Sequence, residues 1–153
     1  MTTAAHRILI TIDEAFARDV AADPLEQIAL RVLESEDVGV AEMGVVVTND
    51  ETVRRLNREY AGDDHATDVL SFSLREGEEF SSPDGVERLG EVIISHPTAV
   101  QQAQEAEHSV EDEVAHLLVH GILHLLGYDH LEPEDEVVMR AREDHLLGRD
   151  HRH

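Results

Sequence analysis

The chain has 153 residues, of which 34 are acidic and 12 are basic, giving a formal net charge of −22. Every basic residue is an arginine, and the absence of cysteine excludes disulfides. This length fits one core, so we expect a single catalytic domain over residues 1–153. The acidic field repels polyanions and excludes nucleic-acid binding through a generally basic surface, leaving only a local basic patch or a metal ion for that purpose.

The sequence predicts a cytoplasmic protein without membrane association. No apolar run reaches the length needed to span a bilayer, and the N-terminal Met-Thr-Thr-Ala-Ala-His-Arg lacks the layout of a secretory signal. A lysine-free acidic composition further suggests a salt-rich cytoplasm, because screening would relieve the self-repulsion of the chain.

Hydrophobic periodicity predicts an α+β fold with a small mixed sheet of about four strands and about five helices, the metal-site helix lying in the core. Strands are predicted at 8–12, 38–47, 68–74 and 90–95, the last an inner strand. Helices are predicted at 23–34, 51–60, 98–106, 109–127 and 132–147.

Helix-capping residues support these boundaries. Asp23 is expected to cap the first helix, with Pro24 at its first position. Asn49 is expected to cap the second, and Ser109 with Asp112 resembles a capping box at the start of the long apolar helix.

The most informative segment is 120–130, His-Gly-Ile-Leu-His-Leu-Leu-Gly-Tyr-Asp-His. His120 and His124 lie one helical turn apart on one face, so both can share an ion. Gly127 can adopt the left-handed conformation that ends a helix, after which the chain reverses and brings His130 back. We therefore predict that these three histidines bind one divalent metal ion.

Three neutral imidazoles without a thiolate suit zinc and leave a fourth position open, which is typical of a catalytic site. His116 lies on the same helix face but about 12 Å along the axis from His124, so we expect it to have a structural or ligand-supporting role. The spacing also matches the extended zincin pattern, except that Gly121 replaces the glutamate that activates water in metalloproteases. Peptide hydrolysis is therefore the weaker interpretation.

The chain resembles the YbeY family of bacterial endoribonucleases through this histidine segment. Further shared features are Leu56-Asn57, Tyr60, Gly62, Asp64, Thr-Asp-Val-Leu-Ser-Phe at 67–72 and Leu-Gly-Glu-Val-Ile-Ile-Ser at 89–95. The resemblance implies a zinc-dependent endoribonuclease, specific for single-stranded RNA, that matures the 3′ end of 16S rRNA and acts in ribosome quality control. It also implies a ribosomal or ribosome-associated partner and one zinc ion on His120, His124 and His130.

One departure from the family concerns phosphate binding. Family members commonly have an arginine directly after the tyrosine that matches Tyr60, where this chain has Ala61. Arg54, Arg55 and Arg58 lie just upstream, and Arg58 is the candidate catalytic residue among them. The alternative is a solvated helix face that pairs with nearby acids.

Zinc on three imidazoles would lower the pKa of a bound water to near ~7, and the resulting hydroxide could attack the phosphodiester. The general base is not assigned: Asp129 is a candidate catalytic residue that acts either as this base or by orienting an imidazole. Asp68 either faces the cleft or has a structural hydrogen-bonding role. Tyr128 either positions substrate or buries its ring.

Two other functions remain open at this point. The same site could hydrolyse peptides or small esters. Alternatively, the chain could be a ribosome assembly factor whose metal ion is structural.

Overall fold

A four-stranded mixed sheet organises the computed structural model, which describes residues 6–36, 38, 40–61, 68–73, 87–127 and 133–147. The strand order is β1-β2-β4-β3, with β1–β2 and β2–β4 parallel and β3–β4 antiparallel. The strands are β1 Arg7–Ile12, β2 Ala41–Thr48, β3 Val69–Ser73 and β4 Glu87–Ser95. The predicted α+β class is confirmed, and β4 is an inner strand as expected.

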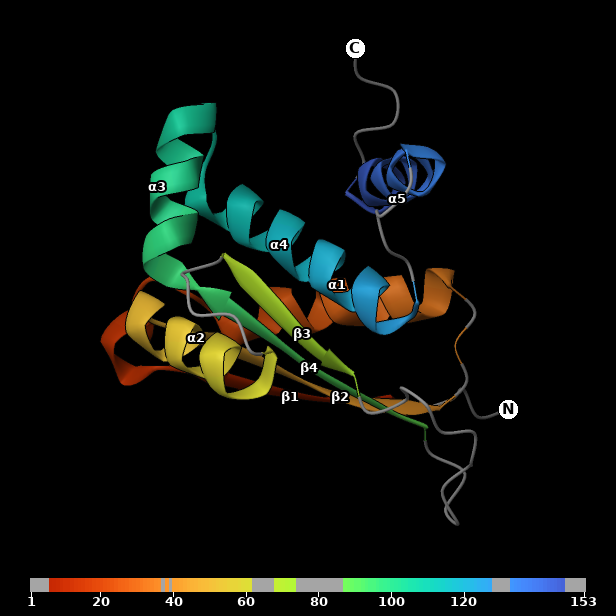
Figure 1. Cartoon of the computed structure of the whole chain (residues 1–153), viewed down its shortest axis with the longest axis horizontal. Helices are drawn as coiled ribbons and strands as arrows, with labels where there is room; N and C mark the ends of the chain where they lie inside the picture. Colours follow the sequence, from red (N-terminus) through yellow and green to blue (C-terminus); the bar gives the residue numbers. More distant parts are fainter. Residues whose placement is uncertain are drawn as a thin grey trace.

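The described part of the chain has five α-helices, of which α5 packs on α4 and α1 and not on the sheet (Figure 1). They are α1 Ala22–Ser35, α2 Asp50–Leu56, α3 His96–Ala106, α4 Val110–Leu125 and α5 Pro133–Leu146. A short 3₁₀ turn at Glu14–Phe16 follows β1, and α2 continues as a π-helical turn over Asn57–Ala61.

The predicted cap of α1, Asp23, is wrong by two residues, because the observed cap position is Ala21. The helix begins at Ala22, and the preceding Ala21 makes no side-chain capping bond. Asp23 therefore lies inside the first turn, where its charge still interacts favourably with the helix dipole. Pro24 is the third helical residue rather than the first, a position that tolerates proline because first-turn N–H groups have no partner within the helix.

The second strand begins later than its apolar run suggests. It starts at Ala41, whereas the sequence pattern placed its start at Val38. The backbone N–H of Val38 donates to the carbonyl of Leu33 at 3.0 Å, so Val38 helps to close the C-terminal end of α1. Its apolar side chain packs against the core from this connection.

The main hydrophobic core lies between the sheet and helices α1 and α4. Its fully buried members on α4 include Leu118, Ile122 and Leu123, which pack with Val45 and Val92 of the inner strands. The helix that carries His120 and His124 is thus a core element, as predicted. Its histidines are held on a rigid support rather than on a loop.

Helix α2 packs on β4 and on α3, apart from this core. Val53 of α2 and Ile93 of β4 are both buried but lie outside the main cluster. Ile93 points to the opposite face of the sheet from Val92, because side chains alternate along a strand. Ser95 and Thr98, at the start of α3, donate hydrogen bonds to Asp50 in the first turn of α2.

Among the described residues, no helix is both long enough and apolar enough to cross a membrane.

Candidate metal centre

The two ends of α4 are fixed by the residues that the sequence singles out. Ser109 accepts a hydrogen bond from the backbone N–H of Asp112 at 3.0 Å, which caps the first turn. At the other end Gly127 has a φ of 106°, and its N–H donates to the carbonyl of His124 at 3.0 Å. Both predicted boundaries are confirmed, and His124 lies in the last turn of the helix.

His120 and His124 direct the same ring nitrogen toward one point. Their Nε2 atoms are 3.2 Å apart, and the rings meet edge to face with centroids 4.7 Å apart. Two imidazole nitrogens on one tetrahedral zinc ion, each about 2.0–2.1 Å from the metal, would be about 3.3 Å apart. The observed pair therefore fits the coordination shell of a single zinc-sized ion.

The other ring nitrogen of His120 is bonded to a carboxylate from α5. Nδ1 of His120 lies 2.5 Å from Oε2 of Glu143, whose side chain is only 7% exposed. Burial raises the pKa of Glu143, but the hydrogen bond with His120 and the charges of His120, His116 and Arg140 outweigh it, so the pKa lies below its ordinary value. Glu143 is therefore an ionised acceptor for the imidazole N–H.

His116 lies beside the same carboxylate. Its Nε2 is 4.0 Å from Oε1 of Glu143, and its ring lies parallel to that of His120 with centroids 6.4 Å apart. The Nδ1 atom of His116 is buried without a hydrogen-bond partner. These contacts agree with the supporting role predicted from its distance to His124.

Gly121 lies where α4 comes closest to the sheet. A Cβ atom at this position would be 2.6 Å from Cγ1 of Val92 and 3.2 Å from Oγ of Ser71. Ser71 also donates a hydrogen bond to the Gly121 carbonyl at 2.9 Å. The position that holds the catalytic glutamate in zincins thus faces β3 and β4 and has no room for a side chain.

The remaining residues of the histidine segment fall outside the described residues. These are Tyr128, Asp129 and His130. Within the described ranges no three histidine, cysteine or carboxylate residues form a group that could hold a metal ion, so His120 and His124 stand as a pair there. The third ligand and the role of Asp129 stay predictions.

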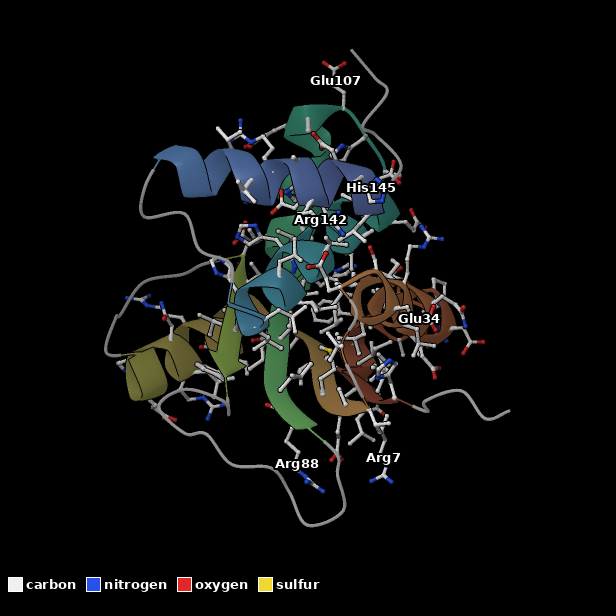
Figure 2. The ribbon with its side chains drawn as sticks, turned by 90° about the vertical axis from the view of Figure 1, so that its right-hand side faces the viewer. Arg7, Glu34, Arg88, Glu107, Arg142 and His145 are labelled. Carbon is white, nitrogen blue, oxygen red and sulfur yellow. The ribbon has the colours of Figure 1, made fainter. Side chains whose placement is uncertain are left out.

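Arg58 lies in the π-helical turn that continues α2, and its side chain is exposed, as are those of Arg54 and Arg55. Strand β3 lies between α2 and α4 in both views (Figures 1 and 2). Helix α2 thus lies across β3 from α4, the helix that carries the histidine pair. The role of Arg58 stays a prediction.

Asp68 has a structural contact in this fold. Its Oδ2 accepts a hydrogen bond from Nε2 of Gln102 on α3 at 3.3 Å, and its carbonyl accepts from the N–H of Ser95 at 2.9 Å. Of the two roles considered from the sequence, these contacts favour the hydrogen-bonding one.

Glu143 is the site residue that sequence reasoning missed. One signal was available, because Glu143 comes three residues before Leu146 and so shares the inward face of α5 with a residue that is 4% exposed. A carboxylate on a buried helix face needs a partner, and a histidine on the core helix is a suitable one.

Comparison with known proteins agrees with the resemblance seen in the sequence. A family model described as endoribonuclease YbeY matches residues 9–151. The chain belongs to the YbeY endoribonuclease family. It is therefore a hydrolytic nuclease of a metalloenzyme family, as predicted.

Individual relatives support this assignment. Proteins named endoribonuclease YbeY are 50% identical over 127 residues in Desulforamulus reducens, covering 82% of this chain and 83% of the relative, and 43% identical over 141 residues in Pelotomaculum thermopropionicum, covering 92% and 90%. The solution structure of a Thermotoga maritima protein is similar in fold, with a TM-score of 0.61 and 25% identity over 94% of this chain and 88% of that one.

Proposed function

We propose that this chain is a zinc-dependent endoribonuclease, folded as one catalytic domain, that cleaves single-stranded RNA and matures the 3′ end of 16S rRNA. We assign His120, His124 and His130 as the ligands of one zinc ion. The observation that carries this proposal is the 3.2 Å approach of the Nε2 atoms of His120 and His124, with the Nδ1 atom of His120 engaged by Glu143.

Zinc bound to this donor set would act as a Lewis acid toward a phosphoryl oxygen and would make water a stronger nucleophile near neutral pH. Two of the three proposed ligands, His120 and His124, lie on the core helix α4, and three imidazole ligands would leave a coordination position for water and substrate. The packed helix that supports these two rings would help to keep a bound phosphodiester in a constant orientation.

Proton transfer needs a group other than residue 121, because Gly121 faces Val92 and Ser71. We propose Asp129, next to His130, either as this base or as a group that orients the imidazole. We propose Arg58 as a phosphate-binding residue for RNA that crosses the β3 edge. It would replace the arginine that family members commonly have at the position of Ala61.

Substrate selection requires help from a partner. The net charge of −22 opposes the approach of RNA, and the aromatic content of 3% provides little surface for base stacking. We therefore propose that the ribosome or a ribosome-associated protein presents the RNA and that the chain takes part in ribosome quality control. This function places the protein in the cytoplasm.

The test is cleavage of defined substrates by the zinc-loaded chain. We expect cuts in a single-stranded RNA that contains the 16S 3′ region, slower cleavage when the same RNA is annealed to a complement, and no cleavage of casein or of small esters. A His124→Ala protein serves as the control for contaminating ribonuclease. Cleavage of peptides by a protein that leaves the RNA uncut would contradict the proposal.

A further inference from the structure

Glu143 and His120 form a partly buried contact between two helices. They are 23 residues apart, on α5 and α4, and their Oε2 and Nδ1 atoms are 2.5 Å apart. The residue Glu143 is 6% exposed. A short contact with a buried carboxylate restricts the imidazole to one orientation.

This contact also selects the tautomer of His120. An ionised carboxylate only accepts hydrogen bonds, so in the neutral imidazole of His120 the proton lies on Nδ1 and Nε2 keeps its lone pair. That Nε2 is the atom that lies 3.2 Å from Nε2 of His124. The opposite tautomer would place a proton on Nε2, where a metal ion has to bind.

The neighbouring residue anchors α5 from the other side. Nε and Nη2 of Arg142 donate to Oε2 of Glu36 at 2.9 and 2.5 Å, and Nη2 also donates to Oγ of Ser35 at 2.9 Å. Figure 2 shows α5 lying across α4, with Arg142 between α5 and the rest of the molecule. Adjacent residues of α5 thus bond to α1 and α4, which fixes the position of the Glu143 carboxylate.

We propose that Glu143 is a positioning residue, which holds His120 in the tautomer and orientation that bind metal. Helix α5 holds this carboxylate next to His120. The inference rests on the proposed assignment of His120 as a ligand. A partner of this kind raises the basicity of a ligating imidazole and fixes its orientation before the metal ion binds.

The experiment measures the dissociation constant for Zn²⁺ of the purified full-length chain by competition with a chelator. Glu143→Ala is expected to weaken zinc binding by about 10- to 100-fold. Glu143→Gln is expected to weaken it less, because an amide oxygen still accepts from Nδ1–H but carries no charge. Equal zinc affinity of wild type and both variants would overturn the inference.

Glu113→Ala provides a matched control. Glu113 also lies on a buried helix face, is 7% exposed, and bonds a histidine ring, with Oε1 2.7 Å from Nε2 of His108. It is seven residues from His120, which is about 10 Å along α4. A purely structural role of Glu143 predicts that both Ala variants lose stability and keep zinc affinity, whereas the positioning role predicts that only Glu143→Ala loses zinc.

A second readout does not depend on metal. The nitrogen-15 chemical shifts of the His120 ring in zinc-free protein should report the Nδ1–H tautomer in wild type and in Glu143→Gln, and a mixture of tautomers in Glu143→Ala. A mixture already present in wild type would overturn the inference. Absence of zinc binding by wild type, together with a fixed tautomer, would contradict the proposed function and not the contact between Glu143 and His120.

Discussion

The side chain of Val92 occupies the space that any side chain on Gly121 would need. A Cβ atom built on Gly121 would lie 2.6 Å from Cγ1 and 3.1 Å from Cγ2 of Val92. Real carbon atoms do not approach so closely, so α4 can lie at its present distance from β4 only with glycine here. This chain thus has the histidine spacing of zincins on a helix whose residue 121 is packed against the sheet.

Gly121→Ala is expected to destabilise the fold. Overpacking costs about 1–3 kcal/mol, and alanine returns up to about 1 kcal/mol through its better helix propensity. Urea unfolding measures the difference. In a Val92→Ala background the contacts with Cγ1 and Cγ2 are removed and the 3.2 Å contact with Oγ of Ser71 remains, so Gly121→Ala should cost less. A loss of equal size in both backgrounds would contradict the packing argument.

Gly44→Ala is the control for this experiment. A Cβ atom at Gly44 would lie 3.3 Å from Cγ of Glu91, part of a flexible side chain that can give way. We expect its free energy of unfolding to change by less than that of Gly121→Ala, although both substitutions add one methyl group.

His124→Ala is expected to lose zinc and RNA cleavage together. Removing one of three imidazoles leaves a site that competes poorly with water for the ion. Elemental analysis of the purified protein gives the zinc content, and a single-stranded RNA gives the activity. His108→Ala, which changes a histidine outside the site, should keep both, and near-stoichiometric zinc in His124→Ala would refute the ligand assignment.

Removal of zinc by a chelator is expected to lower the melting temperature of wild type. Ligand binding to the folded state adds about 2.7 kcal/mol at a free concentration of 100 times the dissociation constant. Thermal unfolding with and without added zinc measures the shift. The melting temperature of His124→Ala should not respond to zinc, and a similar response of both proteins would point to binding elsewhere.

The sequence predicted the elements and their class because each depends on local patterns. The apolar run before Ser95 gave β4, and the Ser109 and Gly127 caps gave the ends of α4. One error concerns the connection between α1 and β2. Val38 is apolar like a strand residue but closes α1, since its N–H reaches the carbonyl of Leu33.

The site was predicted as far as its residues lie within one helical turn. The 3.2 Å pair of His120 and His124 follows from their spacing on α4. Glu143 could not be paired with His120 from periodicity, because that contact depends on how α5 crosses α4. The need for glycine at position 121 could not be predicted either, because it depends on contact with Val92 of β4, 29 residues earlier in the chain.

Arg58→Ala is expected to weaken RNA binding while leaving zinc in place, if the α2 arginines contact phosphate. Losing one phosphate contact should also reduce the slope of log affinity against log salt by about 1. Filter binding of a single-stranded RNA at several salt concentrations measures both. Arg7→Ala is the control, because Arg7 is an exposed arginine on β1 that pairs with Glu42, and equal affinities of all three proteins would remove Arg58 from the site.

Stability should rise with potassium chloride, because a chain with a net charge of −22 repels itself in the folded state. Screening shortens the Debye length to about 3 Å at about 1 M salt, which relieves repulsion between surface carboxylates and also weakens ion pairs such as Arg142–Glu36. Repulsion outweighs attraction here since acidic residues exceed basic ones by 34 to 12. The urea midpoint of unfolding should therefore rise with salt concentration and then level off. General salting-out would raise it continuously, and a fold that depends mainly on ion pairs would have a lower midpoint in salt.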